Sequence, residues 1–409
     1  MSTGIDLLSH LRSLRVLAAV AQAGSSQAAA ALLHVAQSSV TRAVQQLEAA
    51  LACSLFERGA RGMSATPKGG QLALRTQRAL QFLADADRHH TRSAPPPWHG
   101  SLLARGLSAR HLQVLQAVAT CGSEGRAASQ LGVSQPAVHQ ALQQLEHMAG
   151  ATLCIRSRSG LRLEDAGEAL LLASRLAQAE LRQAEDEWAE PGASLQGRLT
   201  IGTLPFSTTM LLAPSVAQLL LQQPATRVVL VDGTFEALMA QLRRAELDCV
   251  VGALRSQPLA ADLTQELLFE DRLALMVRAG HPLAQQQPLT WADLRNAQWV
   301  LPMPDTPAER ALAQMLQAAG LPPPADQLRV NSALMMQTLL MGSERLALMS
   351  PRQLAREVQA GLLVELALPV QHAPRPIGVV WRNAYLPTPT VAQWQAIVRQ
   401  WGASLSGRP

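Results

Sequence analysis

Two stretches of the chain decide its fold: VAQSSVTRAVQQLE at residues 35–48 and VSQPAVHQALQQLE at residues 133–146. They lie at the centre of a gap-free internal repeat, in which residues 14–69 match residues 112–167 at an offset of 98. Most of the shared positions are apolar or turn-forming, so the repeat preserves a fold. The sequence therefore predicts two copies of one helical module in its N-terminal half.

Each copy has the pattern of a helix, a Gly-Ser turn, a second helix, a short turn, a third helix and a loop that leads into a further helix. In the third helix of the first copy, Val40, Val44 and Leu47 recur at helical spacing and are expected in the core. The opposite face is then polar and exposed, with Ser38, Ser39, Thr41, Arg42 and Gln45. The second and third helices of each copy would form a helix-turn-helix unit, and such side chains on the later of its two helices can contact base edges in the major groove. An ordinary solvated helix is the alternative, and the repetition of the motif argues against it.

Charge is concentrated at the start of the chain. Residues 1–92 carry ten Lys or Arg and five acids, whereas residues 105–190 carry eight and ten. A local basic excess suits a polyanionic partner, although a solvated basic face would give the same count. The loop at residues 58–68 is rich in Gly and cations, which is typical of a wing that lies on DNA phosphates through Arg58, Arg61 and Lys68.

These motifs resemble the winged helix-turn-helix of the LysR-type transcriptional regulators. Besides the two stretches quoted above, LFERGARG at residues 55–62 and LCIRSRSG at residues 153–160 carry the resemblance. It implies that the second copy also has DNA-binding residues, namely Gln135, His139, Gln140, Arg156 and Arg158. The family normally has one such module, so two in tandem depart from its pattern.

The copies differ on the face expected to contact DNA. The first has Thr41-Arg42 where the family usually has a Ser-Arg pair, whereas the second has His139-Gln140 and so lacks the cation. We therefore expect the first copy to be the main DNA-binding module. Binding by both copies, or by the second alone, stays open because Arg156, Arg158 and Arg162 supply cations to the second wing.

The copies also differ at their helix starts. The first has Thr66-Pro67, a cap followed by Pro at the first helical position, where the second has two acids, Glu164-Asp165. Conversely, Ser134 is expected to cap the third helix of the second copy, where the first has Ala36. The second copy is thus expected to be the better-capped scaffold.

From residue 198 the pattern changes to short β-branched runs that alternate with helical stretches, which is typical of parallel α/β layers. GRLTIG at residues 197–202 and AELDCVVGALR at residues 245–255 resemble the LysR-type effector domain. Further strands are expected at residues 327–330 and 345–349, and a last strand at residues 377–381 and a last helix at residues 390–401 are expected to return to the first lobe. The expected fold class is α+α/β: two tandem winged helix-turn-helix modules, a linker helix, and a two-lobed, periplasmic-binding-protein-like α/β effector domain.

The domain boundaries follow from these patterns. We expect the first module at residues 10–70, a linker helix and Pro-rich spacer at 71–105, the second module at 106–167, a linker or dimerisation helix at 168–192 and the effector domain at 197–409. Its first lobe is expected at about 197–266 and 372–409, and its second at about 267–371. The three prolines Pro95-Pro96-Pro97 are expected to hold the two modules apart.

Small ligands of two-lobed α/β domains bind where strand ends and helix N-termini face the cleft between the lobes. The residues expected at these positions are Thr203, Pro205, Ser207, Thr208, Thr234, Thr306 and Ser332. Hydroxyls and backbone N–H groups there favour a small anionic metabolite. The alternative is that these hydroxyls only cap helices.

Other function classes find little support in the sequence. No P-loop, GxSxG, HExxH or CxxC motif occurs, so we expect no catalytic residue, no metal site and no cofactor. No apolar run reaches the roughly 18 residues of a bilayer span, and a cytoplasmic location without a membrane partner is expected. The expected partners are double-stranded promoter DNA, a small-molecule effector and further copies of the chain in a homodimer or homotetramer, with RNA polymerase as a further candidate. The competing hypothesis is a DNA-binding module fused to an enzyme-like or solute-binding domain with no regulatory response.

Overall fold

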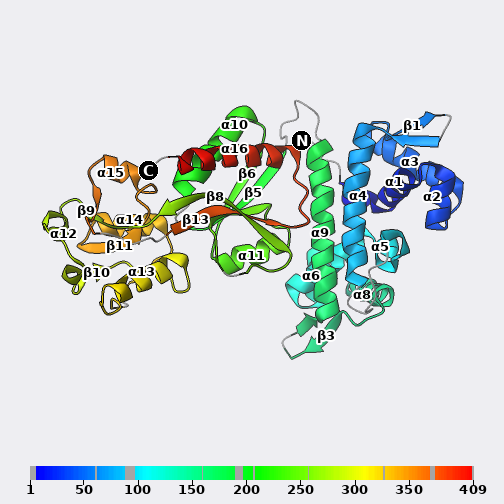
Figure 1. Ribbon diagram of the computed structural model, residues 1–409. Coiled ribbons are helices and arrows are strands. Elements are labelled where there is room, and N and C mark those ends of the chain that lie inside the picture. Colours follow the sequence, from blue (N-terminus) through cyan, green and yellow to red (C-terminus); the bar gives the residue numbers. More distant parts are fainter. Residues whose placement is uncertain are drawn as a thin grey trace. The chain divides into compact units, whose positions relative to one another are not determined.

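The computed structural model describes residues 6–59, 62–87, 97–158, 160–188, 197–205, 208–256, 258–325, 328–368 and 374–407, and for Arg58, Thr208 and Pro374 only the backbone. The chain divides into two compact units, Met1–Ser194 and Leu195–Pro409 (Figure 1). The first unit contains the repeated modules and the second contains two β-sheets with their covering helices.

The first module has the predicted order of elements. After the 3₁₀ turn η1 (Leu7–His10), its elements are α1 (Leu11–Ala23), α2 (Ser26–Leu33), α3 (Gln37–Leu51), β1 (Phe56–Gly59), β2 (Gly62–Ala65) and α4 (Pro67–Asp85). The strands β1 and β2 form an antiparallel hairpin. Val40, Val44 and Leu47 are buried in the core, as their spacing predicts.

The second module repeats this order. After η3 (Trp98–Gly100) and α5 (Leu102–Gly106), its elements are α6 (Ala109–Cys121), α7 (Glu124–Leu131), α8 (Gln135–Ala149), β3 (Cys154–Ser157), β4 (Gly160–Leu163) and α9 (Asp165–Trp188). The strands β3 and β4 are again an antiparallel hairpin. Both modules therefore have one architecture.

The repeat is preserved down to single hydrogen bonds. The Met63 N–H donates to the Gly24 carbonyl at 2.9 Å, and its equivalent Leu161 donates to Gly122 at 2.8 Å. Each bond attaches the second strand of the hairpin to the turn that follows the first helix. The hairpin is thus fixed to the helices in the same way in both modules.

A glutamate of the third helix fixes the other end of each hairpin. Glu48 Oε1 accepts the N–H of Leu55 at 2.8 Å, and its equivalent Glu146 accepts the N–H of Leu153 at 2.9 Å. These bonds satisfy a backbone donor at the point where the chain leaves the third helix and enters the hairpin. The shared Glu of the two quoted stretches therefore has a structural role.

The helix caps agree with the sequence in one case and not in the other. Thr66 caps α4, its Oγ1 accepting the N–H of Gly69 at 3.0 Å, as predicted. The expectation that the side chain of Ser134 caps α8 is wrong. Ser134 lies at the N-cap but makes no side-chain cap bond, because Pro136 has no N–H and the N–H of Ala137 donates to the Ser134 carbonyl.

The two modules pack against each other through an antiparallel pair of helices, α4 and α9 (Figure 1). Arg78 of α4 pairs with Glu180 of α9 at 2.8 Å, and Lys68 lies over the ring of Trp188. Residues late in α9 therefore lie beside residues early in α4, so the two helices run antiparallel. One contiguous hydrophobic core runs through both modules and both long helices.

This packing corrects two expectations. The modules are not held apart by the Pro-rich spacer, of which Pro95 and Pro96 lie outside the described residues and Pro97 precedes η3. The apolar face of α9, expected to bind a second subunit, is buried within the chain, largely against α4. Its buried apolar side chains are Leu170, Leu171, Ala173, Ala177, Ala179, Leu181 and Ala184.

The second unit begins with a five-stranded sheet in the order β6-β5-β7-β13-β8. Its strands are β5 (Arg198–Thr203), β6 (Arg227–Asp232), β7 (Cys249–Ala253), β8 (Leu263–Arg272) and β13 (Pro374–Arg382). β5 is parallel to β6 and β7, and β13 is antiparallel to β7 and β8. The helices α10 (Ala213–Gln222) and α16 (Pro389–Ser406) cover one face of this sheet and α11 (Phe235–Arg243) covers the other.

The other sheet has the order β10-β11-β9-β12. Its strands are β9 (Ala274–Arg278), β10 (Gln298–Trp299), β11 (Arg345–Met349) and β12 (Leu363–Glu365). α13 (Pro307–Ala318) packs on one face and α14 (Ala333–Met341) on the other. The shorter helical segments of this unit are η4 (Thr208–Leu212), α12 (Pro282–Gln285), η5 (Trp291–Leu294) and α15 (Ala355–Gln359).

The predicted return of the C-terminal strand to the first sheet is confirmed, because β13 pairs with β7 and β8. The expectation of parallel layers is correct only in part, since both sheets also contain antiparallel pairs. β8 and β12 were not predicted. β8 stays in the first sheet as far as Arg272, so the chain enters the second sheet later than the expected residue 267. The strand expected at residues 327–330 is only a bridge between Leu301 and Arg329, and Gln327 lies outside the described residues.

Candidate nucleic-acid and effector sites

The third helix of the first module presents its predicted polar face. Ser38, Ser39, Arg42 and Gln45 are exposed, and Thr41 is half-buried with its hydroxyl donating to the carbonyl of Gln37 at 3.2 Å. Arg42 makes no ion pair with any residue that the structure describes. Its guanidinium is therefore available to an external acceptor.

The first wing is described only in part. Arg58 belongs to β1, but its side chain and the whole of Arg61 lie outside the described residues. Lys68 is exposed in the first turn of α4, with Nζ 5.2 Å from the centre of the Trp188 ring. This cation–π contact holds the ammonium group near the start of α4 while leaving its charge accessible.

The equivalent face of the second module carries a different chemistry. Gln135, His139 and Gln140 are exposed on α8, as predicted. His139 Nδ1 lies 3.3 Å from Glu124 Oε1. The imidazole thus already has an acidic partner, in contrast to Arg42 of the first module.

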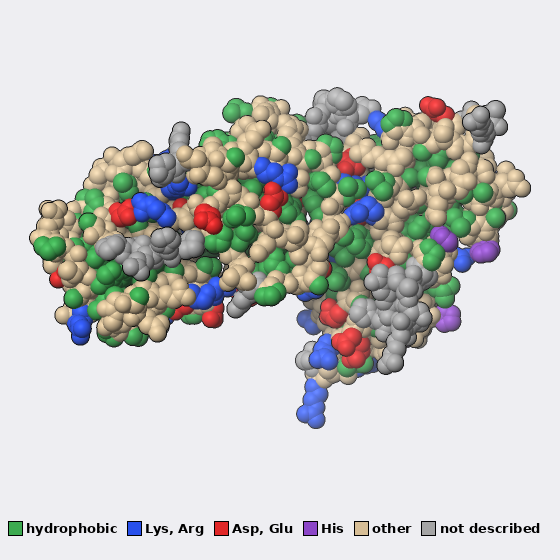
Figure 2. Space-filling model, in the orientation of Figure 1, with side chains coloured by type: hydrophobic (Ala, Val, Ile, Leu, Met, Phe, Trp, Pro, Cys, Tyr) green, Lys and Arg blue, Asp and Glu red, His purple; other side chains and the backbone are tan. Residues whose placement is uncertain are grey.

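The second wing carries exposed cations. Arg156 and Arg158 are exposed in and after β3, and Figure 2 shows Lys and Arg side chains projecting at the β3–β4 end of the unit, next to acidic ones. A hollow of about 260 Å³ lies beside this wing. Its lining consists of Gly122, Ser123, Glu124, Gly125, Gln135, Arg156, Ser157, Gly160 and Leu161.

This hollow contains donors that suit a phosphate group. Residues at the start of α7 and the cationic Arg156 line it together, and the Glu124 carboxylate, also among its lining residues, opposes an anion there. The turn that precedes α7 was not predicted from the sequence as a binding element. The signal was present in the Gly-Ser pair at residues 122–123, which the first module repeats at residues 24–25.

The predicted effector residues of the first sheet lie at the ends of its strands. Thr203 is buried at the end of β5 and its hydroxyl donates to the Asp232 carboxylate. Thr234 caps α11 by accepting the N–H of Ala237 at 3.3 Å. Ser207 lies outside the described residues, as does the side chain of Thr208.

The predicted residues of the second sheet also cap helices. Thr306 accepts the N–H of Glu309 at 3.2 Å, and Ser332 accepts the N–H of Met335 at 3.3 Å. Three of the expected effector hydroxyls, including that of Thr234, therefore have the capping role that was their alternative interpretation.

A buried polar cluster near these loops was not predicted from the sequence. Arg375 Nη1 lies 3.5 Å from Asp271 Oδ2, and the Ser350 hydroxyl donates to Asp271 Oδ1 at 3.0 Å. Arg375 also donates to the carbonyl of Pro205 at 3.3 Å, so it reaches the loop after β5. Burial lowers the pKa of Arg375, which the neighbouring Asp271 partly opposes. A buried cation thus lies beside the predicted effector loop. Its only distinguishing feature in the sequence is that it stands between two prolines, at residues 374–376.

A second arginine joins loops of the two sheets. Arg255, just after β7, donates from Nη1 to the carbonyl of Asp305 at 2.6 Å, and its guanidinium lies 4.3 Å from the centre of the Phe235 ring. Asp305 precedes α13, on the second sheet, and has a left-handed backbone with φ of 61°. This contact links the two sheets at the side where the predicted effector residues lie.

Neither a metal cluster nor a membrane-spanning helix is found in the parts of the chain that the structure describes. Within the described ranges, no group of three or more His, Cys, Asp or Glu could hold a metal ion. Burial raises the pKa of Cys154 to about 11, so this thiol is protonated at neutral pH. No single described helix is long and apolar enough to cross a membrane, and the pair Leu7–Ala23 and Ser26–Leu33 passes that test only together, bent by 119°.

The first unit exposes the polar face of a third helix beside a two-stranded hairpin, which is the arrangement of a helix-turn-helix DNA-binding protein. The second unit is an α/β domain with two sheets, a type of domain that often binds small ligands. Residues 11–70 and 109–168 match the family described as bacterial regulatory helix-turn-helix protein, lysR family, and residues 192–403 match the LysR substrate binding domain. The chain belongs to the LysR family, as the quoted motifs implied.

Individual relatives agree with this assignment. The HTH-type transcriptional regulator GalR of Pseudomonas putida is 34% identical over 396 residues, which cover 96% of this chain and 97% of that protein. That alignment extends through both modules. The HTH-type transcriptional regulator PcaQ of Agrobacterium fabrum is 29% identical over 300 residues and covers 73% of this chain and 96% of that protein. Both are named as transcriptional regulators, which supports the expectation that this chain is not an enzyme.

Solved structures share the fold. LysG of Corynebacterium glutamicum, described as full-length with bound effector Arg, has a TM-score of 0.50 at 21% identity and covers 73% of this chain and 99% of that chain. A full-length, singly substituted OxyR of Pseudomonas aeruginosa has a TM-score of 0.50 at 19% identity, over 71% of this chain and 96% of that chain. In each case more than a quarter of this chain has no counterpart.

Proposed function

We propose that this chain is a sequence-specific, DNA-binding transcription regulator of LysR type whose two helical modules are both winged helix-turn-helix units. Its second unit is a two-lobed, periplasmic-binding-protein-like domain that responds to a small molecule. The observation that carries this proposal is the match of both modules and of the second unit to LysR families, together with the exposed polar face of α3.

The first module is the main DNA-binding module. Arg42 is exposed and has no described ion pair, whereas His139 is next to Glu124 and the neighbouring Gln140 carries no charge. Arg can bind a guanine edge or a phosphate with two hydrogen bonds, and so contributes more than an isolated neutral side chain. The proposed DNA-binding residues are Ser38, Ser39, Thr41, Arg42, Gln45, Arg58, Arg61 and Lys68 in the first module and Gln135, His139, Gln140, Arg156 and Arg158 in the second.

Gel shifts on the native promoter fragment test this ranking. Arg42→Ala is expected to weaken specific binding by about 1–3 kcal/mol, the range for one lost bidentate base contact. Gln140→Ala is the matched control on α8 and should cost clearly less. A larger loss for Gln140→Ala than for Arg42→Ala would make the second module the main one.

The proposed effector is a small anion bound between the two sheets, near Thr203, Pro205, Ser207, Thr208, Thr234, Thr306 and Ser332. Helix N-termini at three of these positions and the buried Arg375 support an anion there. The Arg255–Asp305 contact links the two sheets, so a ligand beside it would favour one arrangement of the lobes by its differential affinity.

The effector proposal is tested by the transcriptional response to a panel of small carboxylates. Thr234→Val keeps the shape of the side chain and removes both the hydroxyl and the cap of α11, so the response should weaken while ligand-free DNA binding stays normal. Thr234→Ser retains the hydroxyl and should respond normally. A normal response of Thr234→Val would move the effector site away from this loop.

The remaining partners are proposed on the same basis. Promoter DNA places the regulator in the cytoplasm of a bacterium, where RNA polymerase is the natural target of its response. Assembly as a homodimer or homotetramer is proposed from the family. Because α4 covers much of the apolar face of α9 within one chain, such assembly would use other surfaces.

A further inference from the structure

The antiparallel pair of α4 and α9 has an internal two-fold relation. The contacts of Lys68 with Trp188 and of Arg78 with Glu180 set a register whose midpoint falls near Ala79 and Ala177. These two alanines lie beyond the repeat itself but are separated by its offset of 98 residues, and they are 0% and 2% exposed. The two modules are therefore related as the two subunits of a symmetric dimer would be.

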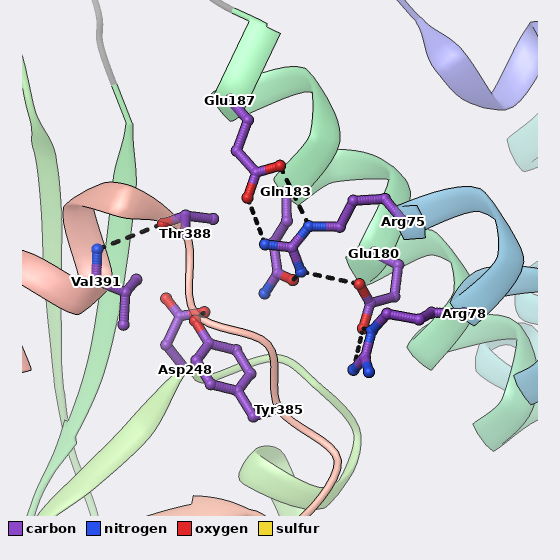
Figure 3. Close-up of polar contacts among 9 residues, drawn as sticks. All are labelled: Arg75, Arg78, Glu180, Gln183, Glu187, Asp248, Tyr385, Thr388 and Val391. Atoms are coloured by element: carbon purple, nitrogen blue, oxygen red, sulfur yellow. Dashed lines mark hydrogen bonds and ion pairs between the residues drawn. The ribbon is translucent and has the colours of Figure 1, made fainter. Parts of the chain in front are cut away.

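A polar cluster within this pair breaks the symmetry. The Arg75 side chain is 1% exposed and donates to Glu180 at 2.9 Å, to Gln183 at 2.9 Å and to Glu187 (Figure 3). The residue of α9 at the same offset of 98 from Arg75 is Ala173, so α9 has no arginine at that place and the cluster has no counterpart there. In a pair of two α4 helices, each buried Arg75 would lose Glu180 and Glu187, and an uncompensated buried charge is strongly destabilising. The cluster therefore selects α9 as the partner of α4.

Contacts beyond the two helices join the modules as well. Arg15 of α1 donates to the carbonyls of Ala104 and Leu107 at the end of α5, with Nε 2.6 Å from the Ala104 oxygen. Burial lowers the pKa of Arg15 to about 10, so it is still charged at neutral pH and its buried donors are satisfied by these carbonyls. The modules thus form one body.

Resting on the proposed function, we propose that one chain supplies both halves of the DNA-binding unit, and that α3 and α8 bind two unlike half-sites of a single, non-palindromic duplex. The hairpins β1–β2 and β3–β4 directly precede the starts of α4 and α9, which lie at opposite ends of the antiparallel pair. The two helices have 19 and 24 residues, or roughly 28–36 Å at 1.5 Å per residue. That span is similar to the ~34 Å of one turn of B-DNA, the usual spacing of two half-sites.

The two half-sites are expected to differ in sequence because the two exposed faces differ. Arg42 of α3 suits guanine, whose O6 and N7 accept two hydrogen bonds from a guanidinium. Gln140 of α8 suits adenine, whose N6 and N7 pair with an amide. A regulator formed from two identical subunits would instead require a palindrome.

The test uses the full-length chain and duplexes based on its footprinted promoter site. One duplex series carries base changes in one half-site only and the other series in the other half-site only. Gel shifts then give the discrimination of each protein between native and altered DNA, for wild type, Arg42→Ala and Gln140→Ala. Arg42→Ala should lose roughly 10- to 100-fold of discrimination in one half-site only. Gln140→Ala should lose a smaller factor, and only in the other half-site.

Each other outcome has a definite meaning. Equal loss at both half-sites with Arg42→Ala, and none with Gln140→Ala, would overturn the inference in favour of two first modules from two chains. Loss of discrimination at one and the same half-site with both variants would overturn it also. Absence of any sequence preference in the wild-type chain would overturn the proposed function itself. Both substituted side chains are exposed, so thermal melting of the variants should match wild type and exclude misfolding as the cause.

Discussion

The two modules of the first unit have the same order of elements but differ in the residues that end their second and third helices. Where α2 and α3 end in the first module, the chain turns through left-handed residues that are not glycine, His34 with φ of 54° and Ala52 with φ of 51°. The second module has Gly132 and Gly150 at the equivalent positions. By contrast, Glu48 and Glu146 make the same two backbone contacts in both.

The comparison shows which positions the repeat retains. Residues are shared where backbone packs against backbone or where a buried donor needs an acceptor, because a change there costs folding free energy in either module. They differ on the exposed face of the third helix, where Arg42 corresponds to Gln140. Divergence at exposed positions on a retained scaffold is what two modules with different DNA preferences would show.

The largest expected effect concerns the cluster that the two modules do not share. Arg75→Ala removes the cation that pairs with the buried Glu187 carboxylate and leaves Glu180 with Arg78 alone, and should lower the free energy of unfolding of the first unit by about 3–5 kcal/mol. Urea unfolding followed by far-UV circular dichroism measures this. Arg78→Ala, whose side chain is 26% exposed, is the control and should cost much less. Equal losses would mean that burial of the cluster does not matter.

A smaller effect tests what the modules do share. A Cβ on Gly69 would lie 2.0 Å from the carbonyl oxygen of Leu55, and a Cβ on its equivalent Gly167 would lie 2.2 Å from that of Leu153. Gly69→Ala and Gly167→Ala should therefore destabilise by similar amounts, about 1–3 kcal/mol each, as overpacking does. Differential scanning calorimetry of the two variants compares them directly. A neutral result for one of them would show that the two scaffolds are not equivalent there.

The smallest effect concerns the residues that end α2, α3 and their equivalents in the second module with a left-handed backbone conformation. His34→Gly and Ala52→Gly remove a steric penalty of about 1 kcal/mol each from the first module and should raise its stability. Gly132→Ala and Gly150→Ala introduce the same penalty in the second module and should lower it. The sign of each change in the midpoint of chemical unfolding is the measurement. Stabilisation by Gly132→Ala would contradict the left-handed geometry.

Much of the first unit was predictable from sequence because its helices are locally encoded. Val40, Val44 and Leu47 gave the buried face of α3, and Thr66 gave the start of α4. The cap at Ser134 was mispredicted because Pro136 removes a donor that the side chain needs. The pairing of α4 with α9 depends on contacts about 105 residues apart, such as Arg75 with Glu180, which no local pattern reveals.

The second unit was predictable in its buried strands and less so at its edges. β11 agreed with its predicted bounds because it is apolar and covered on both faces. β8 was missed because it is an edge strand whose sequence, LTQELLFEDR, has four charged residues and no clear alternation. Thr203 and Thr234 lie at strand ends as expected, but the buried cluster around Arg375 comes from separate parts of the chain and was not foreseen.

The most direct test of the central claim, that α4 pairs with α9 within one chain, is a charge exchange measured in cis and in trans. Arg75→Glu and Glu187→Arg each break the cluster alone, whereas the double variant in one chain restores a pair of opposite charges. We predict that thermal stability and DNA binding recover in the double variant, and do not recover in an equimolar mixture of the two single variants refolded together. Recovery in the mixture as complete as in the double variant would show that α4 pairs with α9 of another chain, and would contradict the claim.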